Sequence, residues 1–438
     1  MTLKFRQPGK ETWSRSQSQK RVARIPPEPE ARPTRLRHPI AKEAGASHLG
    51  PAERARTSQP AHRSRPIVHF IFALPAILVI TQFLCPLAVP VLAKVAVAAL
   101  LLGASQFHFW SRLSSGSVFA PEFPRGIVIL FNWASGAILF LALLQLLLDV
   151  TILAMWMLPG EAPAVPNAVR YAMAAAASLL AAIGVLNAVR VPPLKDIDLG
   201  IRGLPPEFEG YTIVQLTDLH ISRLFPNAWT QRVVERVNTL DVDLIVVTGD
   251  VIDGSLAMRR TDVAPLGALR ARDGVYMSPG NHEYFLGYRE WMQHFADMGM
   301  RILANAHAIL ERRGAHLMLA GVTDASAPAT GQPKPDLVAA LAEGPPGVPI
   351  LLLDHQPRGA RRAAARGVAA QLSGHTHGGM MPGLDRLVAR GNAGFVSGPY
   401  DVDGMTLYVN NGTGIWPGFA LRLRRPSELT RLTLRRAP

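Results

Sequence analysis

Histidine, aspartate and asparagine recur at five points between residues 218 and 377, in combinations that suit metal binding. In chain order the points are Asp218-x-His220, Gly249-Asp250-x-x-Asp253, Gly280-Asn281-His282-Glu283, His355 and Gly374-His375-x-His377. Carboxylate, amide and imidazole ligands in this number are what a pair of divalent metal ions needs. Such a pair can hold both the attacking and the leaving side of a phosphoryl group. The residue types therefore predict a dinuclear centre suited to phosphate esters.

The spacing within each point agrees with this chemistry. Asp218 and His220 are two residues apart on an extended segment, so both can point to one side of a strand end. Asp250 follows Gly249, and a tight turn there lets its carboxylate reach between two ions. Two divalent ions bring roughly +4 and the two carboxylates about −2, which leaves a surplus that suits a phosphate. The nitrogen ligands favour Mn, Fe, Zn, Co or Ni over Mg or Ca, and we expect Mn, Fe or Zn.

Most of these points follow a short apolar run, which is typical of a buried strand. The runs are 213–216, 244–247, 350–353 and 369–372. Helical patterns are expected at 231–240, 264–271, 289–298 and 336–341, and further strands at 405–409 and 428–434. This alternation predicts an α/β domain over residues 210–438, with functional groups held at strand ends.

The first 66 residues differ from the rest of the chain in composition. They hold about 15 Lys and Arg against about 5 Asp and Glu, and they are rich in Pro, Ser and Ala. Such a segment buries too little apolar surface to offset its ordering entropy, so we predict a disordered basic tail that sets topology or binds a lipid surface. From residue 191 onward about 26 basic residues face about 24 acidic ones. The formal charge of +14 therefore gives no reason to expect nucleic acid as a partner.

Residues 67–190 have the composition of a membrane region. Apolar runs occupy 67–85, 88–108, 126–148 and 169–189. Each approaches the ~20 residues that cross a bilayer, so we expect about four transmembrane helices and the lipid bilayer as a partner. Basic residues flank the loop near 109–125 and the exit after 189, whereas 149–167 has no Lys or Arg. This predicts a multi-pass protein of a bacterial inner membrane with a cytoplasmic catalytic domain, while an odd number of spans would place that domain outside.

Two smaller features complete the expected organisation. Pro192-Pro193 and Leu204-Pro205-Pro206 predict a short stiff linker over residues 191–209. The single cysteine, Cys85, cannot form an internal disulfide, which fits a reducing compartment without requiring one.

Taken together, the five points resemble the calcineurin-like metallophosphoesterase superfamily over roughly residues 210–415. The segments 352–357 and 374–379 are similar to those of its bacterial membrane-associated branch. The resemblance implies two packed β-sheets flanked by helices. It also implies that one metal is bound by Asp218, His220, Asp250 and His377. The second metal would be bound by Asp250, Asn281, His355 and His375, with Asp250 bridging the two ions.

The resemblance assigns the chemistry to a pair of side chains beside the metals. His282 would contact the phosphate and act as general acid to the leaving oxygen, and Asp253 would orient its imidazole. Some members of the membrane-associated branch cleave phosphodiester or pyrophosphate bonds in lipid-linked substrates, and we expect the same class here. Met380-Met381 stands where the family often has Gln, so the substrate stays open. The alternatives are a phosphomonoesterase acting on a soluble nucleotide or phosphoprotein, and a metal-binding membrane scaffold without turnover.

Overall fold

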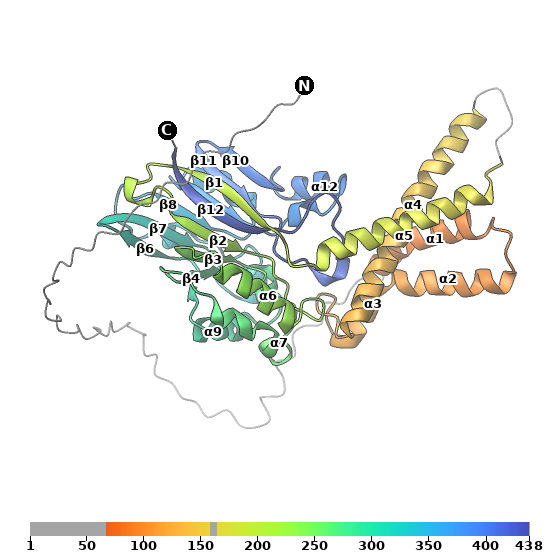
Figure 1. Ribbon diagram of the computed structural model, residues 1–438, viewed down its shortest axis with the longest axis horizontal. Helices are drawn as coiled ribbons and strands as arrows, with labels where there is room; N and C mark the ends of the chain where they lie inside the picture. Colours follow the sequence, from red (N-terminus) through yellow and green to blue (C-terminus); the bar gives the residue numbers. More distant parts are fainter. Residues whose placement is uncertain (1–66, 158–163, 438) are drawn as a thin grey trace, which may run out of the picture. The chain divides into compact units, whose positions relative to one another are not determined.

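The computed structural model describes residues 67–157 and 164–437, so the predicted tail of residues 1–66 lies outside the described residues. The first described part is helical, and a π-helix, Val79–Leu84, continues its first helix. Its α-helices are α1 (Ile67–Leu78), α2 (Val91–Ser105), α3 (Phe107–Ser115), α4 (Arg125–Trp156) and α5 (Asn167–Val189) (Figure 1). Of these, α4 and α5 are each long and apolar enough to cross a membrane. If α2 and α3, bent by 58°, form one span, the described residues contain up to three.

Helix α4 extends the third predicted apolar run well beyond residue 148. It continues through Asp149 to Trp156 as one helix of 32 residues. At 1.5 Å per residue such a helix is about 48 Å long, which exceeds the ~30 Å hydrocarbon core of a bilayer. The first predicted apolar run, 67–85, contains the helical segment Ile71–Leu84, which is shorter than a full span. The expectation of four spans therefore stays a prediction.

The remainder of the described chain forms two six-stranded mixed sheets. The first sheet has the order β1 (Leu194–Arg202), β12 (Leu429–Ala437), β2 (Thr212–Leu216), β3 (Leu244–Thr248), β4 (Val275–Ser278) and β5 (Arg301–Ile302). The second has the order β10 (Gly398–Val402), β11 (Met405–Val409), β9 (Ala370–Ser373), β8 (Ile350–Leu353), β7 (Ala315–Gly321) and β6 (Ala306–Arg312). Strands β2, β3 and β4 are parallel to one another, as are β7, β8 and β9.

The sheets pack face to face, and helices cover their outer faces, as predicted. In β3, Leu244 and Val246 enter the core between the sheets, whereas Ile245 and Val247 face the helices. This alternation is the period-two pattern of a strand that is buried on both sides. The first sheet is covered by α6 (Asn227–Asn238), α7 (Leu256–Val263) and α9 (Tyr288–Asp297) (Figure 1). The second is covered by α10 (Leu337–Leu341) and α11 (Ala360–Ala364).

Two segments differ from the sequence expectation. Residues 191–209 contain strand β1, which pairs in parallel with β12 over nine residues, instead of a plain linker. Leu199 and Ile201 alternate into the core between the sheets, and this burial fixes the segment. The helix expected at 264–271 begins earlier, as α7, and ends in a 3₁₀ turn at Ala264–Ala268. Pro265 lacks the N–H that a continuing α-helix needs, so the turn tightens there.

The topology brings the predicted ligands to one edge of the domain. Parallel strands present their carboxyl ends together, and β2, β3, β4, β8 and β9 all end at this edge. Two short helices follow these ends, α8 (Asn281–Phe285) after β4 and a 3₁₀ turn (His377–Gly379) after β9. One further helix, α12 (Leu384–Gly391), follows that turn.

Candidate metal centre

Every ligand expected from the sequence lies in the connection that follows one of these strands. Asp218 and His220 follow β2, Asp250 follows β3, and Asn281 opens α8 after β4. The second sheet contributes His355 after β8, and His375 and His377 after β9. The two sheets thus contribute to one site from opposite sides, which is why ligands more than 150 residues apart in sequence can meet.

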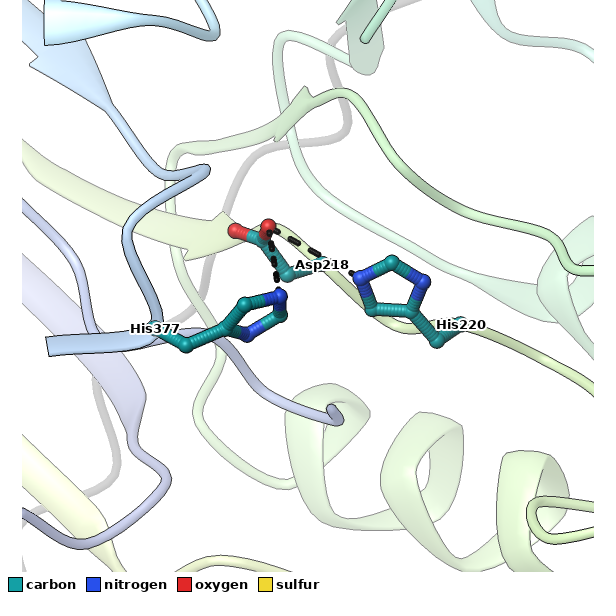
Figure 2. Close-up of side chains that lie close together, drawn as sticks. All are labelled: Asp218, His220 and His377. Atoms are coloured by element: carbon teal, nitrogen blue, oxygen red, sulfur yellow. Dashed lines mark ion pairs between the residues drawn. The ribbon is translucent and has the colours of Figure 1, made fainter. Parts of the chain in front are cut away.

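Asp218, His220 and His377 form the first cluster, and Figure 2 shows both imidazoles directed at the carboxylate. The Nε2 atoms of His220 and His377 lie 3.9 and 3.7 Å from Oδ1 of Asp218. His220 Nε2 is also 3.9 Å from Oδ2 of Asp250. Ligand atoms about 2.0–2.2 Å from one ion are separated by about 3–4 Å in tetrahedral or octahedral geometry. The spacing of this cluster therefore fits one shared ion.

Asp250, His355 and His375 form the second cluster. His355 Nε2 lies 3.2 Å from Oδ2 of Asp250. Asn281 lies next to Asp250, because the N–H of the following residue, His282, donates to Oδ1 of Asp250 at 2.9 Å. Oδ2 of Asp250 therefore lies near His355 of the second cluster and His220 of the first, which is the position that a bridging carboxylate requires.

The hydrogen bonds of the histidines leave lone pairs directed into the site. His355 Nδ1 lies 2.7 Å from the carbonyl oxygen of Thr248, and because a carbonyl oxygen only accepts, Nδ1 carries a proton and Nε2 faces the site. Within the described residues, three buried ligand atoms have no hydrogen-bond partner: His220 Nε2, His355 Nε2 and Asn281 Oδ1. Buried polar atoms without partners are costly unless a ligand satisfies them. The donor set, nitrogen with carboxylate and amide oxygen, fits a pair of divalent transition metals.

The backbone at the ligands is held in a conformation that side chains other than glycine rarely adopt. The left-handed φ values run from 46° to 68° at five ligands: Asp218, His220, Asp250, His375 and His377. Such residues cost of order 1–3 kcal/mol each and persist where the surrounding structure fixes them. Gly374 shows how tight the packing is, because a Cβ added there would lie 2.2 Å from Oδ2 of Asp218. The glycine of the Gly374-His375 motif is therefore required by the ligand beside it.

His282 and Asp253 form a pair next to the clusters. Asp253 is fully buried, and its Oδ1 lies 2.5 Å from Nδ1 of His282. Its other oxygen lies 3.1 Å from Nδ1 of His220. One carboxylate thus orients both the candidate acid and a candidate ligand, and both imidazoles keep Nε2 for the site. The second of these contacts was not expected from the sequence, which paired Asp253 with His282 alone.

Electrostatics in the centre show an excess of buried negative charge beside imidazoles. Burial raises the pKa of Asp218, whereas at Asp250 burial is outweighed by His355 and His282, which hold its pKa well below the usual range. Burial and the neighbouring His355 lower the pKa of His375 to about 4, so its imidazole is neutral and available to a metal. Burial opposes charge on His282, but Asp250 and Asp253 raise its pKa to about 9. Divalent ions at the adjacent ligands would act against that last shift.

Two further residues support the centre. The Glu283 carboxylate accepts the backbone N–H groups of Asp250, Val251 and Gly280 at 2.7–3.0 Å, so it organises the loops instead of facing the metals. Arg422 is buried and donates to the carbonyl oxygens of His377, Asn411 and Gly414. Sequence reasoning missed Arg422, because its partners are backbone carbonyls and leave no side-chain pattern.

Comparison with known proteins gives consistent matches. Residues 211–379 match the family model for calcineurin-like phosphoesterases. The chain is 34% identical over 272 residues to a transmembrane protein with metallophosphoesterase domain of Danio rerio, covering 59% of this chain and 61% of that protein. The corresponding protein of Bos taurus is 35% identical over 274 residues, with 60% and 61% covered. An uncharacterized metallophosphoesterase of Helicobacter pylori strain J99 is 31% identical over 253 residues, with 57% and 66% covered.

These matches are partial in length. The alignments span 61% of each vertebrate relative. Among solved structures, a 5'-nucleotidase precursor from Thermus thermophilus aligns at 19% identity with a TM-score of 0.33, covering 52% of this chain and 54% of that one.

Proposed function

The chain belongs to the calcineurin-like phosphoesterase family, and from this premise we propose that it is a membrane-anchored, dinuclear-metal phosphohydrolase. Its substrate would be a phosphodiester or pyrophosphate, carried by a lipid. One observation carries the proposal: Asp250 of the second cluster also lies 3.9 Å from His220 of the first, and His282 with its partner Asp253 stands beside both clusters. A metal site with a purely structural role needs no general acid, so this pair favours turnover.

The chain's own residues would divide the work as follows. Asp218, His220, Asp250 and His377 would hold one ion, and Asp250, Asn281, His355 and His375 the other. When bound, two divalent ions supply Lewis-acid polarisation of the phosphoryl group and a water of lowered pKa. We assign the metals to Mn, Fe or Zn from the nitrogen-rich ligand set.

His282 would handle the proton of the leaving group. Asp253 accepts the Nδ1 proton, which orients the ring and leaves Nε2 facing the site. A proton on Nε2 can then pass to the leaving oxygen as the bond to phosphorus breaks. Asp253 stays ionised in this scheme, because His220 and His282 outweigh burial and lower its pKa.

The lipid-linked part of the proposal is supported by the contact between the catalytic domain and the apolar helices. Leu421 is fully buried against α4 and α5, and the backbone N–H of Arg422 donates to the carbonyl oxygen of Gly184 in α5 at 2.9 Å. The site is therefore held close to helices that would lie in a bilayer, where an amphiphilic substrate would be concentrated. A soluble nucleotide or phosphoprotein gains nothing from such an arrangement, which makes the monoesterase the second candidate.

We also propose that the catalytic domain lies in the cytoplasm of a bacterial cell with an inner membrane. The connection between α3 and α4 is flanked by Arg112 and Arg125, and the second of these contacts the catalytic domain, since Arg125 Nε donates to the carbonyl oxygen of Leu224 at 2.9 Å. That contact supports placing the two on the same side, and the positive-inside rule selects the cytoplasm. Reporters fused after Pro438 test the side directly, and a signal from a periplasmic reporter alone would reverse the assignment.

The hydrolytic activity can be tested with the full chain purified in detergent and loaded with Mn²⁺. Bis-p-nitrophenyl phosphate, p-nitrophenyl phosphate and a lipid-linked pyrophosphate would be compared, with Asp250→Ala in parallel to measure contaminating activity. We expect turnover that favours the diester or the lipid pyrophosphate and is lost after chelation. Hydrolysis of the monoester alone would show instead that the protein is a phosphomonoesterase. Two bound metals without any turnover would support the scaffold instead.

A further inference from the structure

The connection between α3 and α4, residues 117–124, forms part of the surroundings of the metal centre. Glu122 in this connection pairs with Arg223, at 2.8 Å, and with the buried Arg259. Arg259 also donates from Nε to the carbonyl oxygen of Asp253 at 3.0 Å. The connection is therefore fixed to the backbone of the residue that orients His282. A segment between two apolar helices reaches the centre in this way.

Phe119 is the side chain that this connection places at the centre. Its ring meets the imidazole of His282 edge-on, with centroids 5.1 Å apart. It also stacks on Phe285 at 5.7 Å and lies 5.7 Å from Trp416. Phe119, Phe285 and Trp416 are all half-buried, so part of each ring stays open beside the fully polar metal ligands. We call these three residues the aromatic group.

The aromatic group continues toward the apolar helices. The Trp416 ring lies 5.6 Å from the imidazole of His108 in α3, and His108 stacks on Phe72 of α1 at 4.2 Å. Phe72 is 40% exposed on a helix whose outer surface is apolar. Ring contacts thus connect the centre with a surface that a bilayer would cover.

We propose that the aromatic group is a subsite that binds an apolar moiety of the substrate next to the scissile phosphate. The proposal rests on the proposed function, in which His282 serves the leaving oxygen. Any group attached to that oxygen must come close to the rings around His282. The ring faces there stabilise an alkyl or aryl group. Phe119 gives the α3–α4 connection a direct part in substrate selection.

The subsite can be tested with short alkylphosphonates, which carry a phosphate-like head and a chain of chosen length. Methyl-, butyl- and hexylphosphonate would be measured as competitive inhibitors of bis-p-nitrophenyl phosphate hydrolysis by the Mn²⁺-loaded full chain. Each buried methylene strengthens binding by up to about fourfold. We expect the inhibition constant to fall by about tenfold or more from methyl to hexyl. An inhibition constant that does not change with chain length would overturn the subsite.

Variants then assign the effect to Phe119. Phe119→Ala should reduce the methyl-to-hexyl ratio of inhibition constants at least about fivefold, whereas Phe119→Leu should keep most of the ratio. Phe109→Ala is the matched control, because Phe109 is an exposed α3 ring that contacts Trp110 instead of the centre. Phe119→Ala with a wild-type ratio, or an equal loss in Phe109→Ala, would contradict the proposal.

The two proposals fail in distinguishable ways. If the wild-type chain shows no metal-dependent hydrolysis, the proposed function fails and the subsite with it. If hydrolysis and inhibition by methylphosphonate are present but chain length has no effect, the subsite alone is wrong.

Discussion

The edge that carries the metal ligands and the face that packs on α4 and α5 are built in opposite ways. At the metal edge, buried polar atoms lack partners and five ligands have left-handed backbone. At the other face, which we call the helix seam, the side-chain oxygen and nitrogen of Asn132 both have hydrogen-bond partners. The helix seam consists of Asn132 and Gly136 of α4, Ala181 and Gly184 of α5, and Leu421. The metal edge lowers the stability of the folded chain until metals bind, whereas the helix seam raises that stability without a ligand.

The helix seam is a close fit of small residues around one large one. A Cβ added at Gly136 would lie 2.9 Å from the methyl groups of Leu421, and one at Gly184 would lie 3.2 Å from the same side chain. Asn132, 2% exposed, accepts the N–H of Ala420 at 2.6 Å and donates to the carbonyl oxygen of Pro417 at 2.9 Å. The comparison therefore predicts that changes at the metal edge abolish chemistry, whereas changes at the seam lower stability.

The largest effect is expected for Asp250→Ala. Asp250 belongs to the second cluster and lies 3.9 Å from His220 of the first, so its loss should remove both metals and reduce turnover on the order of 10⁴-fold. Elemental analysis of the purified variant gives the metal content, and bis-p-nitrophenyl phosphate gives the activity. A variant that keeps two ions would refute the bridging role.

His282→Ala should separate chemistry from metal binding at the same edge. Loss of a general acid typically costs about 10²–10⁴-fold, and the loss should be greater for an alkyl diester than for the nitrophenyl ester, whose leaving group needs little protonation. Metal content should equal that of the wild type. Equal losses on both substrates would argue that His282 binds the phosphate without donating a proton. His294→Ala, in α9, is a matched control because His294 lies outside the ligand clusters.

The metal edge could be predicted from the sequence because its ligands follow strands that the sequence also shows. Asp218 and Asp250 each end a short apolar run, and parallel strands bring such ends together. In the sequence, only the adjacent glycines indicate the left-handed backbone at these ligands. No sequence pattern indicates the position of Phe119, because its neighbours come from elements that are distant in the chain.

The helix seam could not be predicted from the sequence, because its contacts join residues that are far apart in the chain. Asn132 and Ala420 are 288 residues apart, and their hydrogen bond has no spacing rule. Strand β1 was missed similarly: Leu199 and Ile201 alternate with exposed or half-buried neighbours, and the partner strand β12 lies more than 200 residues further on. Prolines on both sides of β1 favoured a linker, and only pairing across the whole domain shows otherwise.

Leu421→Ala tests the seam by removing the side chain that fills it. Buried leucine truncations cost about 2–5 kcal/mol when the cavity cannot collapse, and two glycines leave few atoms to fill this one. We expect a lower apparent thermal midpoint in detergent, with metal content kept and specific activity at low temperature near that of the wild type. Loss of metal at low temperature would show that the seam and the metal edge are not separable.

Asn132→Ala should lower the thermal midpoint least, and it tests whether the hydrogen bonds of the helix seam stabilise the chain independently of its apolar packing. The change leaves the N–H of Ala420 and the carbonyl oxygen of Pro417 without their partner in a buried place, which costs about 1–3 kcal/mol. The midpoint should therefore fall less than for Leu421→Ala. Because Ala420 and Leu421 share the same segment, the double variant should lose less than the sum of the single losses. If the two losses in thermal midpoint add up in the double variant, the hydrogen bonds of Asn132 and the packing of Leu421 stabilise the segment 417–421 independently.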